Sequence, residues 1–139
     1  MSTLIRPEIS KRKVEWIPKH RYYELKHFCL QYPEWKKQLA NEIFLRSSST
    51  IDTTNDIQVE FIDKTSDIVS KLMDYSKNVE LIETTCKAID ILLWKYLLEA
   101  VTKNKSWNYL KYVKEIPCGR NKFYSMYRKF FYELDKRKR

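Results

Sequence analysis

The side chains with the clearest chemical capability lie near the C-terminus, on a segment that the apolar spacing predicts to be helical from about Arg120. Arginine and asparagine form bidentate hydrogen bonds with guanine and adenine, and Arg120 and Asn121 stand together at its start. Lysines suit contacts with phosphate. The helix side opposite the apolar stripe holds seven candidates for contact with nucleic acid: Arg120, Asn121, Lys122, Tyr124, Ser125, Arg128 and Lys129. Lys105, upstream, is an eighth.

The positive charge of the chain is concentrated in the same region. The 139 residues have a formal net charge of +9, and residues 101–139 hold twelve Lys and Arg against three Asp and Glu. Residues 1–100 hold fifteen of each and are therefore neutral. This asymmetry indicates a polyanionic partner for the C-terminal region, and we expect double-stranded DNA. The basic tail over 136–139 would add phosphate contacts and make binding depend strongly on salt.

Catalytic and metal-binding chemistry have little support in the sequence. The two histidines, His20 and His27, stand among basic residues, and Glu24 with His27 is the single helical pair of metal-ligand type. No phosphate-binding loop or nucleophile motif occurs. We therefore expect no enzymatic activity, no cofactor and no metal ion.

The three cysteines, Cys29, Cys86 and Cys118, are widely spaced and odd in number. This pattern fits reduced thiols and matches neither a disulfide framework nor a zinc site. Cys118 has some functional prospect, because a basic turn before a helix start would lower its pKa. A structural role at that corner is the favoured alternative.

Two helices joined by a tight corner would position the basic side chains, and together they form a predicted helix-turn-helix over residues 103–139. Asn104 or Ser106 would cap the first helix. That helix would bury Trp107, Leu110 and Val113. The corner over 116–119 contains the only glycine of the chain, Gly119, which we expect to adopt a positive φ. The second helix should pack on the first and on the end of the preceding long helix, through Phe123, Tyr127, Phe130 and Leu134.

An apolar stripe with alternating spacings of four and three precedes this module. It consists of Ile68, Leu72, Tyr75, Val79, Ile82, Cys86, Ile89, Leu93, Tyr96 and Ala100. We expect one helix from Asp63 or Thr65 to about Thr102, because no Gly or Pro interrupts it. The stripe predicts coiled-coil packing, either inside the monomer or in a homodimer through this helix. A second stripe widens the apolar face and consists of Val69, Met73, Leu81, Leu92 and Leu97. The apolar residues over 92–98 predict that this end of the helix is buried.

An N-terminal helical pair is predicted before the long helix. Pro18 suits the first turn of a helix over 19–32, and Pro33 would then restart the chain as a second helix. One face of that second helix would hold Trp35, Leu39 and Ile43. Residues 46–56, rich in Ser, Thr and Asp, are predicted to form a loop.

A single glycine and four prolines are too few for a sheet-rich chain, so we expect an all-α protein. Its predicted parts are a basic arm over 1–17 that includes Lys11-Arg12-Lys13, a helical or oligomerisation region over 18–102, and the helix-turn-helix over 103–139. No apolar run approaches the roughly 20 residues of a membrane span. We therefore expect a cytoplasmic protein without a membrane partner.

The order of these features resembles the phage late transcriptional regulators of the RinA type. The similarity rests on Tyr32-Pro33-Glu34-Trp35-Lys36-Lys37, on Asp63-Lys64-Thr65 after a Ser/Thr/Asp-rich loop, and on Ile82-Glu83 in mid-helix. It also rests on a terminal module similar to the DNA-binding region of sigma factors, in which Phe123 and Phe130 take the buried positions. The resemblance implies activation of late phage genes in a bacterial host by promoter binding, with the host RNA polymerase as a partner. Two departures are the corner over 117–120, where the family has Ser or Thr, and the aromatic residues at aliphatic positions.

Two other functions fit the same pattern. A small terminase-like packaging protein also joins a helix-turn-helix to an oligomerising helical region, and a ring-shaped oligomer would favour it. A protein interaction module, with the long helix binding a partner and the basic tail serving solubility, would show no affinity for DNA even at low salt.

Overall fold

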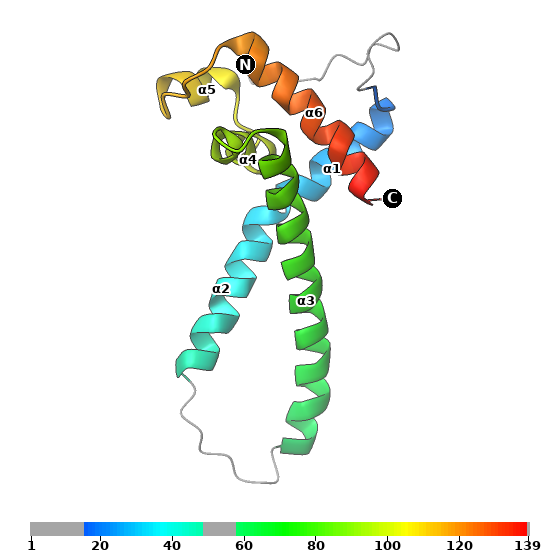
Figure 1. The fold of residues 1–139 in the computed structure, drawn as a ribbon. Helices are drawn as coiled ribbons and strands as arrows, with labels where there is room; N and C mark the ends of the chain where they lie inside the picture. The colour runs from blue at the N-terminus through cyan, green and yellow to red at the C-terminus, as the bar shows by residue number, and fades with distance from the viewer. Residues whose placement is uncertain (1–15, 49–57, 139) are drawn as a thin grey trace.

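The computed structural model describes residues 16–48 and 58–138, with side chains described for 16–42 and 66–138. Its helices are α1 (Lys19–Leu30), α2 (Tyr32–Ser48), α3 (Gln58–Ile89), α4 (Trp94–Lys103), α5 (Trp107–Tyr112) and α6 (Arg120–Lys138). No strand occurs in these ranges, so the predicted all-α class is confirmed. Helices α2 and α3 form a long open arm, and the other helices gather around its upper end in Figure 1.

The predicted N-terminal helical pair is confirmed. The carbonyl of Pro18 accepts a hydrogen bond from the Tyr22 amide at 2.9 Å, so the proline directly precedes α1. The chain turns at Gln31, and Pro33 lies in the first turn of α2, where its missing N–H costs nothing. On α2, Trp35 is buried and Leu39 is half-buried, as the predicted face requires.

Several sequence predictions lie outside the described residues. These are residues 1–15 of the predicted basic arm over 1–17, most of the loop over 46–56, the side chains of Ile43, Asp63 and Thr65, and Arg139. Two boundaries are corrected: α2 extends to Ser48, into the predicted loop, and α3 begins at Gln58, before the predicted cap.

The predicted single helix up to Thr102 is wrong, because α3 ends at Ile89 and α4 starts at Trp94. The cause is Asp90, whose Oδ1 accepts hydrogen bonds from the backbone amides of Leu92 at 2.9 Å and Leu93 at 3.0 Å. Such a side-chain acceptor competes with the helical hydrogen-bond ladder, so the helix ends here without Gly or Pro. The expectation that residues 92–98 form a buried end fails at Leu92, which is 85% exposed on this turn.

The apolar stripe of the long helix is divided into parts with different environments. Val79, Ile82 and Cys86 are buried in the core, whereas Ile68, nearer the far end of the arm, is 47% exposed. Beyond Asp90 the stripe continues on α4, where Ala100 is buried. The stripe is therefore not one continuous seam.

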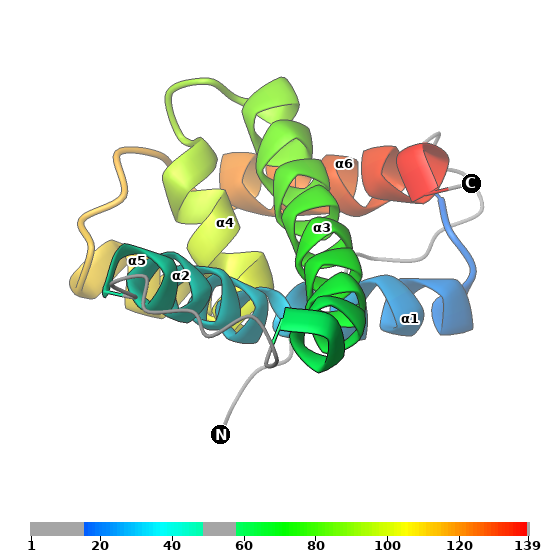
Figure 2. The same ribbon diagram turned by 90° about the horizontal axis from the view of Figure 1, so that it is seen from below.

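Helix α6 passes behind α3 in Figure 2 and packs on α3 and α1. It contributes three of the four largest fully buried side chains, Phe123, Phe130 and Phe131. An aromatic cluster joins it to α1: the ring of Phe131 lies 5.0 Å from that of Tyr22 and 4.9 Å from that of Tyr127, both edge-on. The hydroxyls of Tyr22 and Tyr127 hydrogen-bond at 2.9 Å in the same buried layer. The predicted stripe of Phe123, Tyr127, Phe130 and Leu134 is confirmed as buried. The predicted packing on the end of the long helix is confirmed, since α6 packs on α3 and α4. The other predicted partner is corrected: α6 packs mainly on α3, α1 and α4, whereas α5 packs on α4.

The corner between α5 and α6 differs from the prediction. Ser106 caps α5 by accepting a hydrogen bond from the Tyr109 amide at 3.3 Å, as expected. The residue with a positive φ at this corner is Glu115 (56°), whereas the φ of Gly119 is not positive. Gly119 instead directly precedes α6, where its carbonyl accepts from the Phe123 amide at 3.1 Å. Val113, predicted to be buried, is 62% exposed, because α5 ends at Tyr112 and the helical spacing does not continue to it.

Candidate nucleic-acid interface

Helix α6 is buried along one side and open along the other. Its seven buried side chains are Phe123, Met126, Tyr127, Phe130, Phe131, Leu134 and Asp135. They recur at spacings of three and four, so the residues between them form a second line on the opposite side. At about 1.5 Å of rise per residue, a helix of this length is roughly 28 Å long and its width suits a DNA major groove.

Five of the eight predicted contact residues share this open side of α6. Asn121, Lys122 and Lys129 are exposed, whereas Ser125 and Arg128 are half-buried along its edge. The side that faces solvent thus combines amide, hydroxyl, guanidinium and ammonium donors. These are the groups that hydrogen-bond to base edges and phosphates.

Arg120 and Tyr124 form a pair at the start of α6, beside this open side. The guanidinium carbon of Arg120 lies 5.3 Å from the centre of the Tyr124 ring. Tyr124 is half-buried and its ring contacts that of Phe123 at 5.6 Å. The Tyr124 ring thus contacts both Arg120 and Phe123, and its contact with a base stays a prediction.

Lys122 is tied to the turn between α3 and α4. Its ammonium lies 3.9 Å from Oδ2 of Asp90, whose other oxygen holds the turn. A phosphate at this position would have to displace or share an ion pair. Lys122 is thus less available for a predicted phosphate contact than Lys129, for which no ion pair is found among the described residues.

Lys105 lies apart from α6, in the connection between α4 and α5. Its ammonium is 4.5 Å from the centre of the Tyr109 ring, and the hydroxyl of Tyr109 donates to Glu99 at 3.2 Å. The structure places Lys105 on the rim of α5, so it does not join the seven candidates on α6.

Tyr132 extends the open side of α6 and was not among the predicted contacts. It is half-buried, and the ammonium of Lys136, a predicted phosphate ligand of the basic tail, lies 4.4 Å from its ring centre. The signal was present in the sequence, because Ser125, Lys129, Tyr132 and Lys136 follow one another at spacings of four, three and four.

The two acidic residues of α6 are both engaged by arginines. Asp135 is buried and accepts a hydrogen bond from Nε of Arg21 in α1 at 2.6 Å, and Glu133 pairs with Arg137 at 3.3 Å. The hydrogen bonds to Asp135 and to Glu24 raise the pKa of Arg21. Neither carboxylate of α6 therefore presents unbalanced negative charge to a polyanion.

The less favoured alternative for Cys118, a reactive thiol, is not supported. Partial burial raises the pKa of its thiol and Asp90 adds to this, whereas Lys122 opposes it. The raised pKa therefore counts against the reactive alternative, and the structural role remains the favoured prediction. Cys29 and Cys86 are buried free cysteines, and burial raises the pKa of both thiols above the usual range.

Among the residues that the structure describes, no three His, Cys, Asp or Glu side chains gather as a metal site. No helix there has the length and apolar character that a membrane crossing requires. Comparison with family models, with curated proteins and with solved structures gives no match. The candidate interface is therefore defined by the geometry of this chain.

Proposed function

We propose that the chain is a transcriptional regulator that binds double-stranded DNA sequence-specifically, with the open side of α6 in a major groove. The observation that carries this proposal is the division of α6 into a core-packed face and an opposite face of hydrogen-bonding and basic side chains. A recognition helix needs both properties. Rigid attachment limits the entropy lost on binding, and the polar side reads base edges.

The residues divide into two roles by position and chemistry. Asn121, Ser125 and Arg128 stand on successive turns and would contact base edges, with Arg120 at the near end of the site. Lys129 and Lys136 would contact phosphates on the flanking strands. The absence of unbalanced acids on α6 and the net charge of residues 101–139 support electrostatic attraction to DNA.

The resemblance to regulators of the RinA type extends this proposal. It implies that the controlled genes are late phage genes, that the effect is activation, and that the host RNA polymerase is a partner. Two copies of the chain would present two α6 helices to half-sites separated by about one turn of DNA or a multiple of it.

A terminase-like packaging function is the second candidate. The observation in its favour is the open α2–α3 arm, which offers a surface for assembly in addition to the basic helix. A ring-shaped oligomer on DNA would support packaging, and a monomer or dimer would support regulation.

A gel-shift titration at two salt concentrations tests DNA binding, with DNA fragments from the chain's own genomic neighbourhood as probes. We expect Asn121→Ala and Arg128→Ala each to lower affinity for the selected fragment by roughly 5- to 150-fold, since a good base contact discriminates by about 1–3 kcal/mol. Lys129→Ala should weaken binding to all fragments and reduce the salt slope by about one. Lys77→Ala, an exposed lysine on α3, is the matched control and should change neither quantity.

The outcomes separate the alternatives. Unchanged affinity of Asn121→Ala and Arg128→Ala for the selected fragment would exclude them as base readers. Absence of any shift at low salt would refute DNA binding and support the protein interaction module.

A further inference from the structure

Helix α5 presents an aromatic ring to solvent at the outer end of the group of helices (Figure 1). Tyr112 is 74% exposed, and it is the only exposed aromatic residue among the side chains that the structure describes. Leu110, the buried residue of α5, lies two positions earlier, so the two side chains point to different sides of the helix. The described residues therefore leave most of the Tyr112 ring uncovered.

Lysine ammonium groups lie beside the aromatic rings of α5. Nζ of Lys111 is 4.9 Å from the centre of the Trp107 ring and 5.3 Å from that of Tyr112. A second ammonium, that of Lys105, is 4.5 Å from the centre of the Tyr109 ring. A ring and a neighbouring cation together suit a nucleotide, because the ring stacks on the base and the cation binds the phosphate.

The segment around α5 is positively charged. Residues 103–114 hold four lysines and no Asp or Glu. One of the four, Lys114, lies 3.9 Å from Oε1 of Glu99 on α4 and is balanced by it. For the other three, no ion pair is found among the described residues. The surface of α5 therefore attracts an anionic partner.

Unpaired bases match this surface better than a duplex does. In double-stranded DNA each base is stacked between its neighbours, so its faces are not available to an aromatic ring. In a single strand the faces are free, and an aromatic side chain stacks on any base while basic side chains follow the backbone. The exposed ring of Tyr112, beside the ammonium of Lys111, therefore favours a single strand.

We propose that α5 binds single-stranded DNA, with the Tyr112 ring stacked on an unpaired base and Lys111 on a neighbouring phosphate. Lys105 contacts a phosphate further along the strand. This surface lies on a different helix from the open side of α6, so it goes beyond the proposed binding of duplex DNA. The choice of DNA over RNA rests on that proposed function, because stacking and phosphate contacts are available to both.

Fluorescence anisotropy of the full chain with a labelled oligodeoxyuridylate of about 12 nucleotides tests the proposal. Tyr112→Ala should lower the affinity by roughly 5- to 150-fold, the range for loss of one base–aromatic stack. Tyr112→Phe keeps the ring and should bind like the parent, whereas Tyr112→Leu keeps only an apolar side chain and should bind like the alanine variant. An abasic strand of the same length and charge should lose the same affinity.

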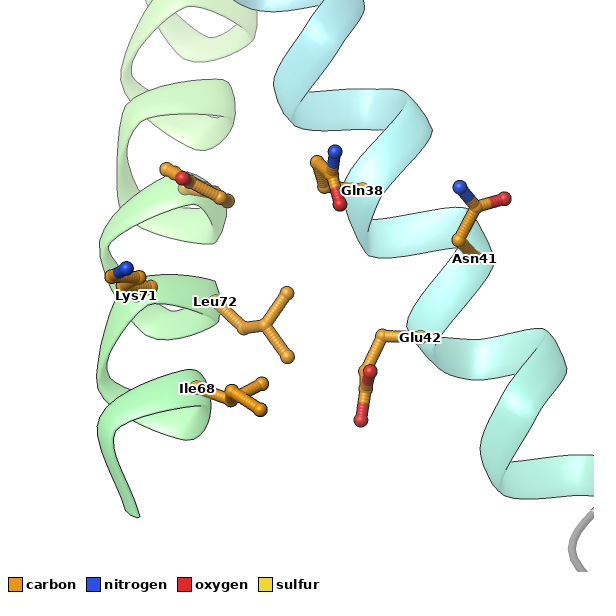
Figure 3. Close-up of a pocket in the computed structure, with 7 residues that line it drawn as sticks. Gln38, Asn41, Glu42, Ile68, Lys71 and Leu72 are labelled. Carbon is orange, nitrogen blue, oxygen red and sulfur yellow. The ribbon is translucent and has the colours of Figure 1, made fainter. Parts of the chain in front are cut away.

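The phosphate contact has its own variant and control. Lys111→Ala should reduce the salt slope on the single strand by about 0.7. Lys71→Ala is the matched control and should leave the slope unchanged. Lys71 is an exposed lysine that lines the cleft of about 420 Å³ between α2 and α3 (Figure 3). No contact of its ammonium with an aromatic ring is found among the described residues.

Each result supports or overturns the site. Equal affinity of the parent and Tyr112→Ala, equal affinity for the abasic strand, or no binding at low salt overturns it. A Tyr112→Leu variant that binds like the parent overturns base stacking. Tighter binding of oligouridylate, which differs from the probe only in its 2′-hydroxyls, overturns the assignment to DNA. Circular dichroism checks that the variants stay folded, as the exposure of Tyr112 predicts.

A duplex probe titrated alongside separates this site from the proposed function. A chain that binds the single strand through Tyr112 and binds no duplex refutes the proposed function and leaves the α5 site standing. A chain that binds duplex DNA and no single strand does the reverse.

Discussion

Replacing Phe131 with alanine tests whether α6 belongs to the core. Phe131 has no exposed surface, and its ring lies about edge-on to Tyr22 of α1 at 5.0 Å. It makes similar contacts with Tyr127 at 4.9 Å and Phe130 at 5.0 Å, both on α6. The side chain therefore joins α6 to α1 at the centre of the aromatic cluster, and its removal would leave a cavity there.

The expected loss of stability follows from these contacts. Truncation of a buried phenylalanine costs about 3–5 kcal/mol, and each edge-on aromatic pair contributes about 0.5–1.5 kcal/mol beyond its buried area. We expect Phe131→Ala to fall near 4–5 kcal/mol, close to the total stability of about 5–15 kcal/mol for a small protein. Phe131→Leu keeps most of the buried volume and should cost about 1–2 kcal/mol, so it stays measurable if the alanine variant unfolds.

Urea unfolding followed by far-ultraviolet circular dichroism measures both variants. Tyr132→Ala is the neighbouring control, because Tyr132 lies on the open side of α6 and its truncation should cost less than about 1 kcal/mol. A loss below about 2 kcal/mol for Phe131→Ala, or one equal to that of Tyr132→Ala, would refute the packing of α6 on α1. If the packing holds, deletion of residues 103–139 would remove part of the core together with the candidate interface, so a truncated chain cannot test DNA binding alone.

Four further predictions address the turns and the thiols. Asp90→Ala should cost about 1–2 kcal/mol in urea unfolding by removing the acceptor that holds the α3–α4 turn, and Asp90→Asn, which keeps an oxygen acceptor, should cost less; equal losses would contradict the capping role. Gly119→Ala should change stability by less than about 0.5 kcal/mol, because its φ is not positive and an added Cβ meets no atom within 4 Å. Glu115→Gly should instead stabilise by about 0.5–1 kcal/mol in the same assay, through relief of a positive φ. Burial raises the pKa of Cys29 and Cys86 above 9.0, so the folded chain keeps both thiols protonated at a pH where the unfolded chain loses its protons. Their contribution to stability is therefore present below about pH 9 and falls as the pH rises through and above it, with a slope that approaches about 1.4 kcal/mol per pH unit for each thiol well above pH 9. Unfolding measured between about pH 8 and pH 10 should show this slope in the parent and a flatter one after replacement of both cysteines by alanine; equal slopes would contradict the burial of the thiols.

Local features of this chain were predictable from sequence because each depends on residues a few positions apart. Pro33 restarts a helix, Ser106 caps one, and the stripe from Phe123 to Leu134 is buried. The open side of α6 follows from the same spacing, since a helix that buries one line of residues exposes the opposite line. Tyr132 was missed although the spacing of its neighbours indicated it.

Turns were less predictable, since the same residue types serve two structures. Asp90 is compatible with a helix interior, and only the direction of its side chain toward two backbone amides makes it a turn residue. The absence of Gly and Pro therefore did not guarantee a continuous helix. In the same way, Glu115 has the positive φ at the corner and Gly119 does not.

Spacing along the chain determined that this protein is helical, which residues of α6 are buried, and where its basic side chains gather. Only the tertiary structure decided that α1 covers α6 through Tyr22 and Arg21, more than a hundred positions away from their partners. It also decided that the heptad stripe is covered at Ile82 and open at Ile68. The physical reason is that periodicity states which side of a helix is apolar. Which other helix covers that side depends on how segments far apart in the sequence pack together in the core.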